Sequence, residues 1–260
     1  ALVVGGELVT KKAKENGVNI IPVDSEHSAL WQCLNFRKDG FDKLIITASG
    51  GPFRNFSSEE LRTVTPEQAL CHPNWKMGDK ITIDCATMLN KGFEVIEAHH
   101  LFGAPLDKIE VVVHPQSVVH SMVRFADGSV IAEMSNPSML QPIQIALTYP
   151  KRISCDIPPL DFIKLSKLEF YKIDEEKYPC FGLALNALKL GGTCPCALNA
   201  ASEIAVRAFL EKEISFTHIA EIIEKTVSSV PTENVTLESL KSVDKKAREI
   251  AYKLKTDYIK

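Results

Sequence analysis

Lys43-Leu44-Ile45-Ile46-Thr47-Ala48-Ser49-Gly50-Gly51-Pro52 carries the clearest structural signal in the chain. Its first half is apolar and rich in β-branched residues, which predicts a buried strand over residues 43–47. The two glycines that follow permit a tight turn in which the backbone approaches a ligand closely. We therefore expect a buried strand that ends in a candidate binding turn.

The segments around this strand predict a mixed α/β arrangement. Helical spacing and capping signals indicate helices at residues 1–16, 28–36 and, with Asp84 as N-cap, 85–102. Apolar or β-branched runs indicate further strands at residues 20–23, 109–114, 118–125 and 130–134. Asp127-Gly128 is a turn signal that makes the last two strands a hairpin. The expected fold class is α/β (α+β) with a mixed, partly antiparallel sheet.

The second half of the chain changes character. Prolines recur at positions 150, 158, 159 and 179, which indicates a crossing linker over residues 151–179. Apolar residues then follow helical spacing in four segments, 181–190, 198–210, 216–227 and 237–254. We expect a C-terminal helical bundle over residues 180–260.

Composition narrows the class of protein. The chain has 260 residues, 45% of them hydrophobic, and a formal net charge of -3 with mixed signs, which disfavours nucleic-acid and membrane partners. The seven cysteines are an odd number without a CxxC pair, so reduced thiols in a cytosol-like compartment are the simplest account. No leader or bilayer-spanning run is visible. Because Ala1 opens directly into a helical pattern without methionine, we expect the chain to begin partway through a larger protein.

Asp24 and Glu26 are the first candidate metal ligands. They lie two residues apart in a segment expected to be extended, so both carboxylates would leave the same side and converge on one cation. Hard oxygen ligands of this kind suit Mg²⁺ or Mn²⁺. The competing interpretation is a solvated acidic strand end.

A third acid could come from the helix expected after Asp84. Asn90 and Glu94 are i, i+4 neighbours, which places an amide and a carboxylate on one face beside Lys91. Glu97, one turn later, competes with Glu94 as the ligand. An ordinary exposed charged face is the alternative.

Several residues are of the types that bind phosphate through hydroxyl, amide, imidazole or ammonium groups. They are Ser25, Ser49, His72, Asn90 and Lys91. Each alone is more often a turn or cap residue.

Residues 71–78 contain Pro and Gly together with Trp75 and Met77, and no apolar residues at a regular spacing flank these two side chains. The segment therefore predicts a mobile lid.

Six ordered motifs together resemble the 1-deoxy-D-xylulose 5-phosphate reductoisomerase family of the non-mevalonate isoprenoid pathway. They are Val23-Asp24-Ser25-Glu26-His27, Thr47-Ala48-Ser49-Gly50-Gly51-Pro52-Phe53-Arg54, residues 72–78, Ala86-Thr87-Met88-Leu89-Asn90-Lys91-Gly92, His114-Pro115-Gln116-Ser117-Val118-Val119-His120-Ser121 and Asn199-Ala200-Ala201-Ser202-Glu203-Ile204. They extend over nearly the whole chain, so chance agreement is implausible.

The resemblance implies a role for each candidate. Asp24, Glu26 and Glu94 would hold the divalent metal (Mg²⁺, Mn²⁺ or Co²⁺) and, with Lys91, form the catalytic set. The implied substrate contacts are Ser25, Ser49, His72, Trp75, Met77, Cys85, Asn90 and Lys91. Gly78 is the candidate for contact with the NADPH cofactor. The family reaction is NADPH-dependent isomerisation and reduction of the substrate to 2-C-methyl-D-erythritol 4-phosphate, by a homodimer that is cytoplasmic in bacteria or lies in a plastid-type organelle.

Two departures from the family pattern affect these expectations. Cys85 stands where the family usually has a serine on the phosphate, and a thiol is a poorer donor. No GxGxxG fingerprint occurs in the 260 residues, so the family's Rossmann domain is expected to lie outside them. We therefore expect weak metal and phosphosugar binding but little turnover from this chain alone. The implied division is a remnant of the dinucleotide-binding domain (1–22), a catalytic domain (23–150), the linker (151–179) and the bundle (180–260).

Two other functions remain open at this stage. A metal-dependent phosphosugar aldolase or isomerase would use the same metal and phosphate sites without nicotinamide. A non-catalytic phosphosugar-binding or assembly module would use the helical bundle for its contacts. Turnover with and without NADPH separates the first from the family reaction, and the metal affinity of Glu94→Gln bears on the second.

Overall fold

A computed structural model describes residues 1–35 and 40–259, which form two compact units. Unit 1 comprises Ala1–Asn16, Gly50–Glu97 and Asp174–Lys260, and unit 2 comprises Gly17–Ser49 and Ala98–Ile173. Both units are discontinuous in sequence, whereas each of the four functional parts expected from the sequence is one continuous stretch of chain. That functional division stays a prediction.

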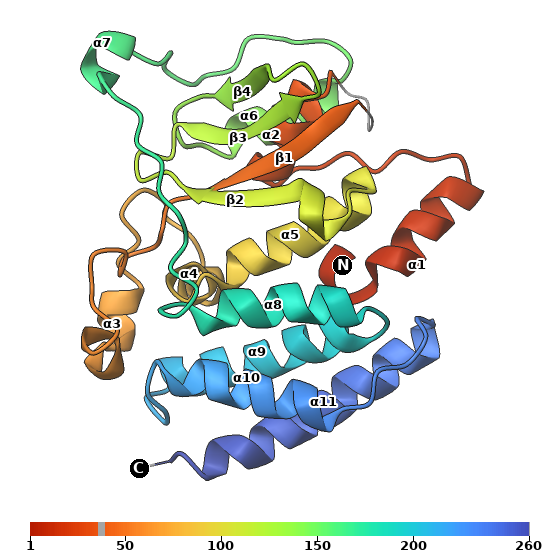
Figure 1. Ribbon diagram of the computed structural model, residues 1–260, viewed down its shortest axis with the longest axis vertical. Helices are drawn as coiled ribbons and strands as arrows, with labels where there is room; N and C mark the ends of the chain where they lie inside the picture. Colours follow the sequence, from red (N-terminus) through yellow and green to blue (C-terminus); the bar gives the residue numbers. More distant parts are fainter. Residues whose placement is uncertain (36–39, 260) are drawn as a thin grey trace. The chain divides into compact units, whose positions relative to one another are not determined.

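Unit 2 is built on a four-stranded mixed sheet (Figure 1). Its strands are β1 (Phe41–Ala48), β2 (Ile109–Val113), β3 (Val119–Phe125) and β4 (Val130–Met134), in the order β2-β1-β3-β4. β1 is parallel to β2 and antiparallel to β3, which pairs with β4 in the predicted hairpin. The expected mixed, partly antiparallel sheet is confirmed.

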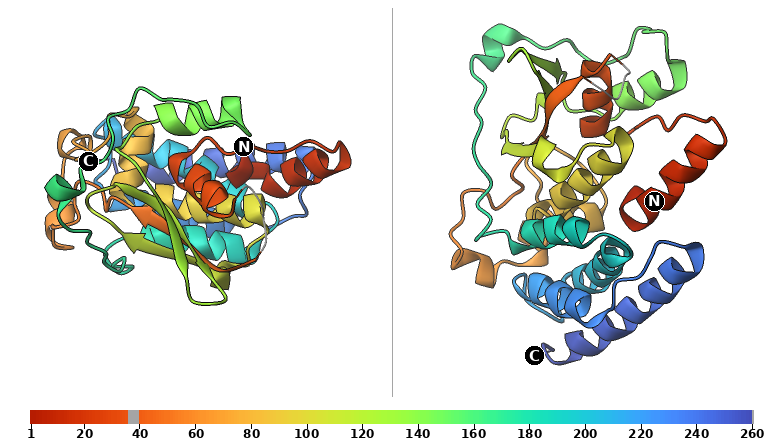
Figure 2. Two further views of the ribbon diagram at one scale, coloured as in Figure 1. Left: turned by 90° about the horizontal axis from the view of Figure 1, so that it is seen from above. Right: turned by 45° about the vertical axis from the view of Figure 1, so that its right-hand side comes forward.

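One face of this sheet is covered by helices. α2 (Ser25–Cys33) packs on β1, β3 and β4 and lies between the sheet and α6 (Leu140–Thr148), as the view from above shows (Figure 2). Leu30 of α2 and Leu44 of β1 are fully buried in this layer. The helix expected at 28–36 begins three residues earlier than predicted and ends at Cys33, with Leu34 as its C-cap; residue 36 itself lies outside the described residues. α6 and the short α7 (Phe162–Leu165) had no counterpart in the expectations.

The strand expected at residues 20–23 is wrong. These residues are irregular and lead into Asp24, which is the N-cap of α2. Pro22 lacks the backbone N–H that a strand would use for pairing. Asp24 instead satisfies a free N–H at the helix start, which is the usual role of an aspartate in this position.

Unit 1 is helical. It holds α1 (Leu2–Glu15), α3 (Pro66–Ala69), α4 (Asp79–Ala86), most of α5 (Leu89–Phe102), α8 (Pro179–Leu190), α9 (Cys194–Leu210), α10 (His218–Ser229) and α11 (Leu237–Thr256). The central helix is α9, which packs against α1, α4, α8, α10 and α11 (Figure 1). Its buried Ala200, Ala201 and Ala205 are small enough to let the surrounding helices approach closely. The expected C-terminal bundle is confirmed.

The helix predicted at residues 85–102 is in fact two helices. Asp84 is not an N-cap but lies inside α4, buried, where its carboxylate accepts a hydrogen bond from Lys80 Nζ at 2.5 Å. The break falls at Met88, whose φ of 60° places it in the left-handed region. As a result Cys85 lies at the end of α4, while Asn90, Lys91 and Glu94 lie on the first two turns of α5.

Among the described residues, no helix is both long and apolar enough to cross a bilayer.

Candidate metal and substrate site

Asp24 is fixed in place by the start of α2. Its Oδ2 accepts a hydrogen bond from the backbone N–H of His27 (3.4 Å) and lies 3.1 Å from the His27 ring Nδ1. The His27 side chain is buried, so it cannot swing away from this contact. Glu26 lies in the first turn of the same helix, and its Oε2 accepts a hydrogen bond from Ser25 Oγ at 2.6 Å.

The geometry expected for this pair is therefore wrong, although both residues remain in the site. Asp24 and Glu26 do not lie on one side of a strand; they sit at the N-cap and first turn of a helix. A helix start also favours negative charge, because its free N–H groups and dipole stabilise anions. His27 had no role in the expectations, and the spacing Asp24-x-x-His27 would have indicated it only once the helix start was known.

Glu94 is held by two neighbours on α5. Its Oε1 accepts a hydrogen bond from Asn90 Nδ2 and its Oε2 from Lys91 Nζ, both at 2.6 Å. The side chains of Lys91 and Glu94 are only 7% and 3% exposed. A buried charge pair of this kind costs desolvation energy that the short contacts offset. The i, i+3 and i, i+4 spacing predicted from the sequence is confirmed as a contact.

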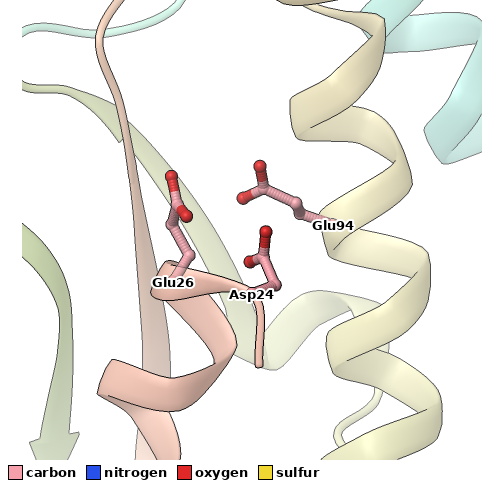
Figure 3. Close-up of side chains that lie close together, drawn as sticks. All are labelled: Asp24, Glu26 and Glu94. Atoms are coloured by element: carbon pink, nitrogen blue, oxygen red, sulfur yellow. The ribbon is translucent and has the colours of Figure 1, made fainter. Parts of the chain in front are cut away.

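The three acids lie close together. Asp24, Glu26 and Glu94 each offer one carboxylate oxygen, and these oxygens lie within 4.8 Å of one another (Figure 3). Three like charges at this distance repel one another unless a cation or protons offset them. Carboxylate oxygens are the ligands that Mg²⁺ and Mn²⁺ prefer, so the donor set fits such an ion. Among the described residues, the third carboxylate of this group belongs to Glu94 and not to its competitor Glu97.

The turn after Ser49 packs directly against the end of α4. Gly50 and Gly51 have φ angles of 82° and 66°, a region that favours glycine. A Cβ atom on Gly51 would lie 2.8 Å from the carbonyl oxygen of Cys85. Only glycine therefore allows this turn to approach Cys85. The close approach of this turn to a ligand stays a prediction.

His72 lies near two cations. Burial lowers its pKa most, and the charges of Lys91 and Arg54 lower it further. Its Nδ1 accepts hydrogen bonds from the backbone N–H groups of Asn74 (3.2 Å) and Trp75 (3.0 Å), so the proton of the neutral ring is on Nε2. A neutral donor beside two cations forms a region that favours an anion.

Arg54 is the residue of this region that the sequence interpretation left without a role. It was quoted within the glycine-turn motif, three residues after Gly51, but nothing in the sequence placed it near His72. The signal that could have found it is its position just beyond a turn that approaches a ligand.

The segment predicted as a lid has no regular secondary structure before α4 begins. Trp75 and Met77 are both partly exposed, and Gly78 is the exposed N-cap of α4. The roles expected for these three residues in closure and in cofactor contact stay predictions. Ser25 is buried beside Glu26, and Cys85 is half-buried.

The chain is similar to proteins of known function. Two family models match the chain: the 1-deoxy-D-xylulose 5-phosphate reductoisomerase C-terminal domain over residues 20–102 and the DXP reductoisomerase C-terminal domain over residues 134–250. A crystal structure of DOX-P reductoisomerase in complex with NADPH, fosmidomycin and magnesium is 42% identical, with a TM-score of 0.91; the match covers 98% of this chain and 68% of that one. The chain belongs to the 1-deoxy-D-xylulose 5-phosphate reductoisomerase family.

Other reductoisomerases agree with this assignment. The enzyme from Zymomonas mobilis, in complex with NADPH, is 47% identical with a TM-score of 0.91, covering 98% of this chain and 66% of that one. The 1-deoxy-D-xylulose 5-phosphate reductoisomerase of Endomicrobium trichonymphae is 51% identical over 256 residues, which is 98% of this chain and 66% of the relative. The chain thus spans about two thirds of the length of such relatives.

Proposed function

We propose that this chain carries the metal- and substrate-binding part of an NADPH-dependent 1-deoxy-D-xylulose 5-phosphate reductoisomerase. Together with a dinucleotide-binding domain of the family's kind, it would isomerise and reduce that substrate to 2-C-methyl-D-erythritol 4-phosphate in non-mevalonate isoprenoid biosynthesis. The observation that carries the proposal is the group of three carboxylates, Asp24, Glu26 and Glu94, in a chain of this family.

The metal would be held by these three carboxylates. Mg²⁺ is present in a related structure, and Mn²⁺ or Co²⁺ suits the same oxygen donors. When bound, the cation would supply Lewis-acid polarisation of the substrate's carbonyl and neighbouring hydroxyl groups. Asn90 and Lys91 orient Glu94 for this task, and His27 orients Asp24. Such outer partners fix ligand direction and tune affinity.

The phosphate of the substrate would bind near Lys91 and His72. Lys91 supplies a point charge and His72 a neutral Nε2–H donor, while Arg54 adds a second positive charge. Ser25, Ser49, Asn90 and the Cys85 thiol are the proposed hydroxyl, amide and thiol contacts. Cys85 is the weakest donor of the set, because S–H groups form weak hydrogen bonds.

Residues 71–78 would close over the bound substrate. Trp75 and Met77 are apolar side chains with exposed surface in a segment without regular structure. Covering the substrate with them would exclude water during rearrangement of a carbon–carbon bond. Gly78, at the end of this segment, is the proposed contact to the nicotinamide cofactor.

The finer features of the proposal concern assembly and location. We infer a homodimer, in the cytoplasm of a bacterium or in a plastid-type organelle. We also infer that residues 23–150 act as the catalytic domain, with 151–179 as linker, 180–260 as supporting bundle and 1–22 as an extension of the dinucleotide-binding domain. Positioning of the nicotinamide then depends on residues beyond this chain, so the chain alone should turn over little substrate.

The test measures NADPH consumption by the full-length protein with 1-deoxy-D-xylulose 5-phosphate and Mg²⁺. We expect turnover that needs substrate, metal and NADPH, and that stops when a chelator removes the metal. Product formation without NADPH would favour a metal-dependent aldolase or isomerase instead. Substrate binding without any product would favour a non-catalytic module.

A further inference from the structure

Asp84 is a buried acid that has no part in the proposed reaction. Only 4% of the residue is exposed. Its Oδ2 accepts a hydrogen bond from Lys80 Nζ at 2.5 Å, whereas its Oδ1 is buried without a hydrogen-bond partner in the described part of the chain. A buried carboxylate is costly unless it is paired. The Lys80 ammonium is therefore the main compensation for burying this acid.

The environment of Asp84 makes it depend on that ammonium. Burial raises the pKa of the Asp84 carboxyl most, and the charge of Lys80 opposes this rise. The carboxylate of Glu203 acts in the same direction as burial. Removing the ammonium would leave either an unpaired buried charge or a protonated acid. An ionised Asp84 thus requires its contact with Lys80, one turn earlier on α4.

Lys80 also reaches beyond its own helix. Its Nζ lies 3.5 Å from Ser202 Oγ of α9 and 5.6 Å from the centre of the Phe93 ring of α5. Both of these neighbours are buried, whereas the side chain of Lys80 is 39% exposed and lies at the edge of the interior. One ammonium group therefore connects three helices of unit 1: α4, α5 and α9.

The contact on α9 involves a sequence motif that the proposed reaction leaves without a role, residues 199–204. Ser202 Oγ donates a hydrogen bond to the backbone carbonyl of Asn199 at 2.8 Å, which leaves its oxygen lone pairs available to Lys80. Asn199 Nδ2 in turn donates to Glu203 Oε1 at 2.9 Å. The hydroxyl group that Lys80 meets on α9 is therefore itself held in position.

This cluster lies next to the proposed phosphate contacts. Cys85 directly follows Asp84 on α4, and after the break at Met88 the chain continues into α5, which carries Asn90 and Lys91. Groups that hold α4 against α5 and α9 therefore also determine where the thiol of Cys85 lies relative to the two side chains of α5.

We propose that Lys80 and Asp84 are positioning residues for the phosphate of the substrate. The Lys80 ammonium holds the C-terminal half of α4 against α9 and the start of α5, so that Cys85, Asn90 and Lys91 converge on one anion. Neither Lys80 nor Asp84 belongs to the proposed catalytic or substrate-binding set. The inference rests on the proposed function, because that function supplies the phosphate.

The experiment measures the affinity of the full-length protein for inorganic phosphate by phosphorus NMR, and KM and kcat for 1-deoxy-D-xylulose 5-phosphate. Lys80→Met removes the ammonium and keeps most of the length of the side chain. We expect about tenfold weaker phosphate binding and a similar rise in KM, because losing groups that orient binding residues costs about 10–100-fold. kcat should change by less than about threefold, since contacts to the phosphate act equally in the ground state and the transition state.

Two further variants separate positioning from stability. Lys246→Met, at an exposed lysine of α11, is the matched control and should leave phosphate affinity unchanged. The double variant Lys80→Met/Asp84→Leu replaces the ion pair by an apolar pair, so no unpaired charge stays buried and the urea midpoint should exceed that of Lys80→Met. Its phosphate affinity should stay low, because the connection between the helices is still missing.

Three results would overturn the proposal. The first is unchanged phosphate affinity in a folded Lys80→Met variant or, if that variant does not fold by circular dichroism, in the double variant. The second is a double variant that regains phosphate affinity together with stability, and the third is equal weakening by Lys246→Met.

Phosphate binding is measured without turnover, so this inference and the proposed function can fail separately. A wild-type protein that binds phosphate but does not consume NADPH would contradict the proposed function alone. Turnover with a phosphate affinity that is indifferent to Lys80→Met would contradict the positioning role alone. A wild-type protein that does not bind phosphate would contradict both.

Discussion

Glu94 is oriented before any ligand arrives, because both oxygens of its carboxylate are engaged by residues of its own helix. The same contacts explain why a carboxylate can be almost fully buried beside two other acids. Lys91 offsets part of the negative charge, and a cation bound by all three acids would offset the remainder. The charge of Glu94 is therefore the property to change in a test.

Glu94→Gln should lower the affinity of the chain for Mg²⁺ or Mn²⁺. Loss of partners that merely orient a ligand costs about 10–100-fold in metal affinity, so loss of a ligand charge should cost at least as much. Isothermal titration with Mn²⁺ measures the effect. Glu97→Gln, one turn along the helix, is the control and should leave the affinity within about twofold. Unchanged affinity in a folded Glu94→Gln variant would refute the assignment of the metal ligands.

At the scale of elements, the close contact between α5 and α8 depends on one missing side chain. Gly92 faces α8, and a Cβ atom at this position would lie 2.4 Å from the Cβ of Ala184 and 3.5 Å from the carbonyl oxygen of Phe181. No real contact between carbon atoms is that short, so one helix would have to move. The turn that holds Asn90 and Lys91 would move with α5.

Gly92→Ala should destabilise the chain by about 1–3 kcal/mol from overpacking, less the roughly 1 kcal/mol that alanine gains in a helix. Gly182→Ala in α8 is the matched control. A Cβ at Gly182 meets nothing within 4 Å, so this variant should be neutral or more stable by up to about 1 kcal/mol. Urea unfolding compares the two. Equal urea midpoints for both variants would show that α5 and α8 can move apart without loss of stability.

The elements that the sequence predicted well are those with a strong period and a glycine or polar break at each end. β1, β3, β4 and the helices α8 to α11 meet this condition. The start of α2 and the break between α4 and α5 do not. The apolar run before Asp24 resembles a strand although Pro22 prevents pairing, and Met88 adopts a left-handed conformation that no sequence signal marks.

The candidate site shows the same division. The Asn90-Lys91-Glu94 spacing was predictable, because helical period determines it. The grouping of Glu94 with Asp24 and Glu26 was implied by the family resemblance, and the strand geometry expected for that pair was wrong. The pairing of His27 with Asp24 was not predictable, because it requires the helix to begin at Ser25. The proximity of Arg54 and His72 depends on the path of irregular chain, which periodicity does not describe.

At the scale of the whole molecule, each unit has its own buried interior. Leu198 of α9 is fully buried in unit 1, among the helices that surround α9. Leu44 of β1 is fully buried in unit 2, beneath α2. Two separate interiors permit local opening of one unit at a lower free energy than global unfolding.

Leu198→Ala should cost about 2–5 kcal/mol, and the loss of hydrogen-exchange protection should be concentrated in α8 to α11. Leu44→Ala should have a similar cost but a different distribution, with the loss concentrated in β1 and β3. Hydrogen-exchange mass spectrometry of both variants reads each segment separately. If either variant lowers protection equally throughout, the chain behaves as one cooperative unit.

Because the His72 ring accepts hydrogen bonds from the segment that follows it, the conformation of that segment depends on pH. Both backbone donors, from Asn74 and Trp75, converge on a single lone pair of the imidazole. Adding a proton there would replace attraction by repulsion at both contacts in one event. The fold of this stretch, including the orientation of the indole it carries, is thus tied to the charge of one ring.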